Sequence, residues 1–162
     1  MMQKINQEGL ALIKSFEKLR LYAYDDATGK PVPVGGRAKK VLTIGWGHTK
    51  DVKPGQTCTK EEADAWLTED VASAEQEVNR LITVPLTSNQ FSALVCFQYN
   101  TGRLAISTML KLINQSQYRT AADEFRRWIK DENPVTKKLE IKPGLVTRRE
   151  AERALFLKPE TL

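Results

Sequence analysis

The chain has 162 residues, of which 41% are hydrophobic and 28% are charged, a composition typical of an ordinary soluble globular protein. No apolar run approaches the roughly 20 residues of a membrane-spanning helix. The charged N-terminal stretch lacks the apolar core of a signal peptide, so we expect a protein that is made and kept in the cytoplasm. With two cysteines and one histidine, neither a disulfide scaffold nor a zinc site is expected, and Cys58 and Cys96 should be free thiols.

The first expected helix has a carboxylate on its apolar side. Leu10, Ile13, Glu17 and Leu21 follow the spacing of one helical face. A charge on that stripe is costly unless it is paired or protonated. Either Glu17 lies at the end of the helix and reaches solvent or an arginine, or it is a protonated carboxyl group that works as an acid.

Turn-forming and β-branched residues are concentrated in 22–58, where we expect short strands and loops. Thr59 and Glu62 form a capping box before a helix of about six turns. Further helices are expected between a second capping box, Thr87 with Gln90, and Gly102, and near 106–115, 119–130 and 147–156, the last capped by Thr147 with Glu150.

This order of elements predicts one α+β domain over residues 1–162 with two lobes. The expected parts are a small β-containing lobe (1–58), a connecting helix (59–80) and a mainly helical lobe (81–162). A cleft between the lobes is the default place for a ligand.

The excess of positive charge lies in the second half of the chain. Residues 1–80 are neutral overall, and residues 81–162 hold the whole net charge of +5. This half could bind an acidic polymer, a membrane surface or nucleic acid, or it could be a solvated face without a partner. The basic residues proposed for such binding are Arg126, Arg127, Lys137, Lys138 and Lys142.

Paired carboxylates are the strongest chemical signal. Asp25 and Asp26 follow Glu17, and glycosidic cleavage commonly needs one protonated and one ionised carboxyl group. Nucleotide-binding, serine-hydrolase and zinc-protease motifs are absent. Nothing in the spacing supports a Cys–His nucleophile pair, and we interpret His48 as structural, bonded to a carboxylate.

Several segments together resemble the phage-type lysozymes, or endolysins: "FEKLRLYAYDD", "LTIGWGHT", "QFSALVCFQYNTG" and "GLVTRREAERALF". The resemblance covers nearly the whole chain. Two departures stand out. Sixteen residues separate Asp26 from Thr43, where the family has a short spacer, so a hairpin is expected to be lengthened. Lys18 also stands where a glycine often follows the glutamate.

The resemblance implies a lysozyme-like fold and catalytic roles for Glu17, Asp26 and Thr43. Glu17 would be the general acid, while Asp26 and Thr43 would assist the attack of water, with inversion favoured. Asp25 lacks the family spacing and should be replaceable. Gln98 and Asn100 would line the substrate site or make only structural hydrogen bonds.

The resemblance also implies a biological setting. The substrate would be peptidoglycan, cut between N-acetylmuramic acid and N-acetylglucosamine by a monomer without cofactor or metal, released from the host cytoplasm through a holin. The alternatives are a lytic transglycosylase and a basic module that binds membrane or nucleic acid.

Overall fold

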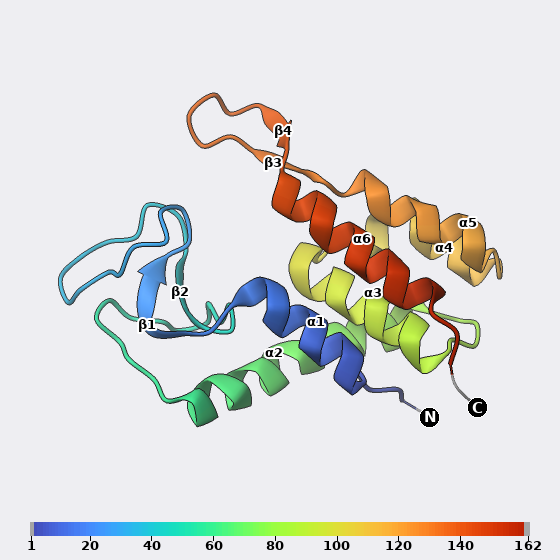
Figure 1. Ribbon diagram of the computed structural model, residues 1–162, viewed down its shortest axis with the longest axis horizontal. Coiled ribbons are helices and arrows are strands. Elements are labelled where there is room, and N and C mark those ends of the chain that lie inside the picture. The colour runs from blue at the N-terminus through green and yellow to red at the C-terminus, as the bar shows by residue number, and fades with distance from the viewer. Residues whose placement is uncertain (1, 161–162) are drawn as a thin grey trace. The chain divides into compact units, whose positions relative to one another are not determined.

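The computed structural model describes residues 2–160 (Figure 1), which divide into two compact units. One unit is Ile13–Ser73, and the other combines the residues before Ile13 with those from Ala74 onward. Helices α1 (Gln7–Glu17) and α2 (Lys60–Leu81) contribute residues to both units. Within residues 2–160, no helix combines the length and apolarity needed to cross a membrane.

A small antiparallel sheet organises the unit Ile13–Ser73. Strand β1 (Arg20–Asp25) pairs with β2 (Leu42–Gly45), and Tyr24 lies opposite Thr43. The second edge of β1 is covered as well, because Ala23 donates its N–H to Gln56 and accepts one from Val32. The expectation of short strands and loops in this region is therefore confirmed.

The long connection from β1 to β2 is folded onto the sheet. Val32 is 5% exposed, and a methyl group at Gly55 would lie only 2.4 Å from Cγ2 of Val34. The carboxylate of Asp25, itself 4% exposed, accepts the backbone N–H groups of Ala27 at 2.9 Å and Lys39 at 2.7 Å. The insertion lengthens the hairpin as expected, but it is an integral part of the unit.

Helix α1 ends at Glu17 because the next residue leaves the helical conformation. Lys18 has φ +53°, in the left-handed region, and its N–H still bonds the carbonyl of Lys14 at 3.2 Å. This is the helix-terminating position that glycine normally occupies. A side chain with a Cβ atom is strained there.

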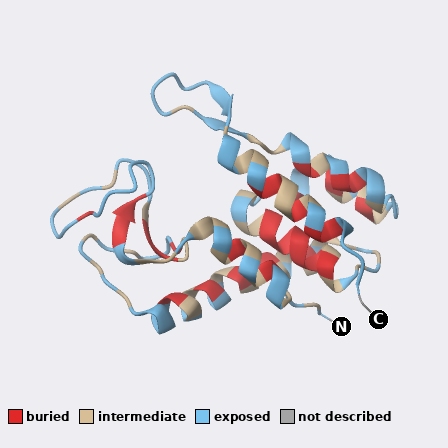
Figure 2. Ribbon diagram, viewed as in Figure 1, coloured by how far each residue is buried: buried red, intermediate tan, exposed pale blue. Residues whose placement is uncertain are grey.

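The other unit is built around α3 (Ser88–Thr101), whose residues 91–97 are all buried (Figure 2). It packs on α6 (Pro143–Leu157), and α4 (Thr108–Asn114) packs on α5 (Tyr118–Glu124). Two 3-10 turns, Leu104–Ile106 and Phe125–Arg127, join these helices. These helices and the small sheet confirm the predicted α+β class.

Of the predicted helix caps, two are confirmed and one is wrong. Both capping boxes are present, since Thr59 and Glu62 exchange hydrogen bonds at 3.1 Å and Thr87 caps α3, which Gly102 ends at φ +64°. The prediction that Thr147 caps the last helix is wrong. Helix α6 begins at Pro143, and the hydroxyl of Thr147 bonds the Pro143 carbonyl inside the helix.

A second hairpin was not predicted. Strand β3 (Lys130–Glu132) pairs with β4 (Leu139–Ile141) in the segment between α5 and α6. The predicted helix at 119–130 is therefore too long. Neither strand shows the alternation of a half-buried strand, because all six residues are exposed.

The strain at Lys18 leads to a test of stability. Lys18→Gly should raise the free energy of unfolding by up to about 1 kcal/mol, because glycine adopts positive φ without steric penalty. Lys18→Ala removes the same side chain and keeps the strain, so it should give no such gain. Urea unfolding of the three proteins measures the difference, and an equal gain from alanine would contradict the account.

The hydrogen bonds to Asp25 lead to a pH-dependent prediction. The amide of Lys39, with those of Ala27 and Lys40, lowers the pKa of the Asp25 carboxyl. Its contribution to stability is complete above the unfolded value of about 3.9 and is lost as pH falls through the lower folded value. Asp25→Asn should therefore destabilise the protein at neutral pH, with a difference that shrinks below about pH 4.

The control for this prediction is the neighbouring residue. Asp26 is exposed, so Asp26→Asn should leave the unfolding transition unchanged at both pH values. Equal stability of Asp25→Asn and the parent protein at neutral pH would remove the structural role of Asp25.

Candidate active site

The carboxylate of Glu17 lies against a tight turn that follows β2. Ile44 and His48 exchange two backbone hydrogen bonds, 2.9 and 2.8 Å long, and enclose three residues. Gly47 within this turn has φ +85°, and a methyl group there would lie 2.5 Å from Oε2 of Glu17 and 3.0 Å from Cδ. Only a residue without a side chain allows the half-buried carboxylate to occupy this place.

Asp26 and Thr43 lie at the same end of the small sheet. Asp26 directly follows β1, and its N–H bonds the carbonyl of Val41 at 3.0 Å. Thr43 is 4% exposed, and its hydroxyl donates to that same carbonyl at 3.2 Å. One backbone oxygen therefore holds the main chain of Asp26 and the side chain of Thr43.

Tyr24 connects these residues electrostatically to Glu17. Burial raises the pKa of the Tyr24 phenol, and the negative charges of Asp26 and Glu17 raise it further. Tyr24 is also paired directly with Thr43 across the sheet. The structure thus gathers Glu17, Asp26 and Thr43 around one tyrosine within a single unit.

Contacts made by Trp46 and His48 hold the turn in place. The indole N–H of Trp46 donates to Asp64 at 2.8 Å, and the Lys14 ammonium lies over the indole ring, 5.3 Å from its centre. His48 bonds Asp70 through Nδ1 at 2.8 Å and stacks on Trp66. The structural interpretation of His48 is confirmed.

Within residues 2–160 the cysteines form no disulfide and the possible metal ligands form no cluster. Cys58 and Cys96 are free, as predicted, and the Cys96 thiol donates to the carbonyl of Gly9 at 3.3 Å. Over this range no group of three or more His, Cys, Asp and Glu side chains is arranged to hold a metal ion.

Gln98 and Asn100 belong to the other unit, where both amide oxygens accept hydrogen bonds. Gln98 accepts the N–H of Leu104 at 3.0 Å, which closes the turn after α3. Asn100 accepts from Nη2 of Arg149 at 2.7 Å. These contacts correspond to the structural alternative for both residues, and a substrate role remains a proposal.

A buried ionic cluster lies behind Asn100. Arg149 and Glu152 are 1% and 0% exposed, and Nη2 of Arg149 donates to the carboxylate at 3.0 Å. Burial raises the pKa of Glu152 to about 7 and lowers that of Arg149, while Arg148, also buried, lies 3.6 Å from the same carboxylate. The sequence analysis did not predict this cluster, because Arg148, Arg149 and Glu152 have the pattern of a charged, solvent-exposed helix face.

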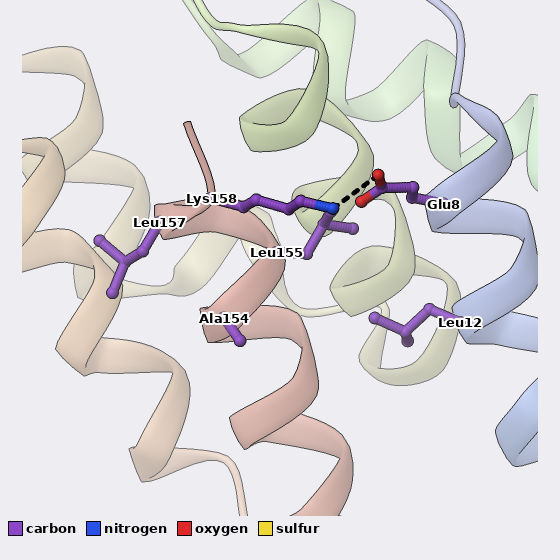
Figure 3. Close-up of a pocket in the computed structure, with 6 residues that line it drawn as sticks. All are labelled: Glu8, Leu12, Ala154, Leu155, Leu157 and Lys158. Carbon is purple, nitrogen blue, oxygen red and sulfur yellow. Dashed lines mark hydrogen bonds and ion pairs between the residues drawn. The ribbon is translucent and has the colours of Figure 1, made fainter. Parts of the chain in front are cut away.

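Two of the hollows in the described part of this unit differ in their lining. One, of about 620 Å³, is lined by polar side chains that include Asn100, Arg103 and Arg149, together with Trp128. The smaller lies between α1 and α6 and is apolar, apart from a 2.8 Å ion pair between Glu8 and Lys158 (Figure 3). Its two charges neutralise each other, so it offers no group for chemistry.

Comparison with known proteins gives a consistent result. The family model described as phage lysozyme matches residues 14–152. An endolysin of Acyrthosiphon pisum secondary endosymbiont phage 1 is 40% identical over 154 residues, 94% of this chain and 97% of that protein. An endolysin of Bacillus phage B103 is 42% identical over 97% of this chain, which spans only 55% of that protein.

Solved structures agree with the sequence relatives. The muramidase domain of SpmX from Asticaccaulis excentricus is 36% identical and superposes with a TM-score of 0.82, over 97% of this chain and 99% of that one. The segment of this chain that matches the family model contains Glu17, Asp26 and Thr43 and includes residues of both units. The chain belongs to the phage lysozyme family.

Proposed function

We propose that this muramidase-type glycoside hydrolase cuts the β-1,4 bond between N-acetylmuramic acid and N-acetylglucosamine in bacterial peptidoglycan. The observation that carries the proposal is the placement of the Glu17 carboxylate against Gly47, in the same unit as Asp26 and Thr43. Glycosidases of this kind use two carboxyl groups with different tasks. The two carboxyl groups proposed here differ in exposure, since Glu17 is half-buried and Asp26 is exposed.

Glu17 acts as the general acid in this proposal. Its half-buried carboxyl group is held at the end of α1 by the turn at Gly47. From that position it delivers a proton to the glycosidic oxygen as the bond to the leaving sugar breaks. The exposed carboxylate of Asp26 stabilises the positive charge that develops on the sugar ring.

Thr43 positions the attacking water. Its hydroxyl proton is donated to the Val41 carbonyl, so the lone pairs of Oγ1 accept a hydrogen bond from water. Asp26 accepts a hydrogen bond from the second O–H of that water and takes up its proton as the oxygen attacks the anomeric carbon from the face opposite the leaving group. This arrangement favours hydrolysis with inversion over the transglycosylase alternative, which uses no attacking water.

The cellular setting is a separate part of the proposal. We infer that the enzyme acts as a monomer at the end of phage infection and leaves the host cytoplasm through a holin. The basic half has a weaker role than its charge suggested. Of the five basic residues named for it, four form ion pairs with neighbouring carboxylates: Arg126, Arg127, Lys137 and Lys142.

The acid role of Glu17 has a direct test. Glu17→Gln keeps nearly the same volume and cannot deliver a proton, so lysis of purified cell walls should fall by about 10²–10⁴-fold. Circular dichroism checks that the variant is folded. A folded variant that clears walls at the parent rate would overturn the assignment.

The contact with Gly47 has a test with a closely matched control. Gly47→Ala and Gly35→Ala impose similar backbone strain, because their φ angles are +85° and +83°. Only at Gly47 does the new methyl group meet Glu17, whereas the Gly35 position has nothing within 4 Å. Both variants should lose similar stability, but Gly47→Ala should also lose about 10²-fold in kcat, because the acid is displaced.

Steady-state release of reducing sugar ends, with thermal unfolding of each variant, separates the two effects. Equal kcat values for the two alanine variants would show that Glu17 does not depend on the turn.

A further inference from the structure

We infer that Lys30 and Lys39 form a cationic subsite beside Asp26 that binds a carboxylate of the peptide attached to N-acetylmuramic acid. The inference deepens the proposed function and rests on it for the identity of the substrate. It concerns the connection between β1 and β2, residues 27–41, which is longer than the family spacer.

The connection carries charge of one sign only. Residues 27–41 contain four cations, Lys30, Arg37, Lys39 and Lys40, and no Asp or Glu. Lys30 and Lys39 are exposed, and neither forms an ion pair anywhere in residues 2–160. Their ammonium groups are available to an anion from outside.

Asp25 brings the two lysines together from opposite ends of the connection. Its backbone N–H donates to the carbonyl of Lys30 at 2.9 Å, and its carboxylate accepts the N–H of Lys39 at 2.7 Å. Residues nine positions apart in the sequence therefore meet at one residue. The next residue along the chain is Asp26, so the backbones of both lysines lie next to the residue that precedes the proposed catalytic carboxylate.

The connection is ordered before any ligand binds. Val32 is buried and Val34 lies close to Gly55. The Asp25 carboxylate accepts one backbone N–H at the start of the connection, from Ala27, and two on its return arm, from Lys39 and Lys40. Little backbone entropy is left to lose on binding, so even two exposed charges can contribute to affinity.

The substrate itself explains why cations are needed here. Peptidoglycan carries peptides with free carboxylates on its N-acetylmuramic acid residues, so it is anionic next to the bond that is cut. The ionised carboxylate of Asp26 would repel such a substrate. Two ammonium groups beside Asp26 offset that repulsion and hold a peptide carboxylate by charge-assisted hydrogen bonds.

The experiment measures binding separately from cleavage. Lys30→Gln/Lys39→Gln is introduced into the inactive Glu17→Gln protein, and co-sedimentation measures its affinity for peptidoglycan freed of attached phosphate polymers. The same material with its carboxyl groups converted to amides is the second substrate. A control pair, Lys4→Gln/Lys111→Gln, removes the same charge from exposed positions in the other unit.

The expected result is a loss of about tenfold in affinity for intact peptidoglycan, since two exposed ion pairs are removed. On the amidated material the double variant and its parent should bind equally, and the control pair should match its parent on both. In the active protein the same double variant should raise KM with little change in kcat.

Three outcomes would overturn the inference. The double variant could bind intact peptidoglycan as tightly as its parent, the loss could persist on amidated material, or the control pair could lose as much. Failure of the proposed function looks different, because the protein with Glu17 would then release no sugar reducing ends while the binding experiment still reports on the lysines.

Discussion

The close approach of the Gly47 backbone to the carboxylate of Glu17 is the constraint on which the proposed site depends. The turn Ile44–His48 brings a backbone without a side chain to the end of α1. Three other features serve this contact. Lys18 ends the helix directly after Glu17, Trp46 is tied to Asp64, and His48 is tied to Asp70. The proposed acid thus lies against a backbone turn that is held by contacts on both sides.

Two adjacent aspartates have different environments, and the proposed mechanism gives them different tasks. Asp25 points into the connection, where three N–H groups bind its carboxylate and lower its pKa. Asp26 is exposed, and its position is set by the Val41 carbonyl that also accepts the hydroxyl of Thr43. Two identical neighbouring side chains therefore differ in burial and partners, and in the proposed mechanism only Asp26 meets the substrate.

Local chemistry made part of the structure predictable. The capping boxes at Thr59 and Thr87 and the stop at Gly102 depend on residues within a few positions of one another, and all three are present. The start of α6 was missed because Pro143 at its first turn is as good a signal as the Thr147 cap, and the pattern gave no way to choose.

Long-range contacts could not be read from the sequence. The partners of Arg149 are Asn100, 49 positions away, and Glu152, three positions away. Only the packing of α6 on α3 buries this group. Likewise, nothing local indicates that Gly47 contacts Glu17. The family resemblance supplied candidate residues, and the fold supplied the contacts that give them distinct environments.

Digestion of purified peptidoglycan in heavy-oxygen water, followed by mass spectrometry of the fragments, tests the central claim most directly. If Glu17 protonates the leaving oxygen while Thr43 and Asp26 direct a water, every new N-acetylmuramic acid end is reducing and carries one heavy oxygen. Anhydro-muramic ends without heavy oxygen would show that no water attacks, and they would contradict the roles given to Thr43 and Asp26.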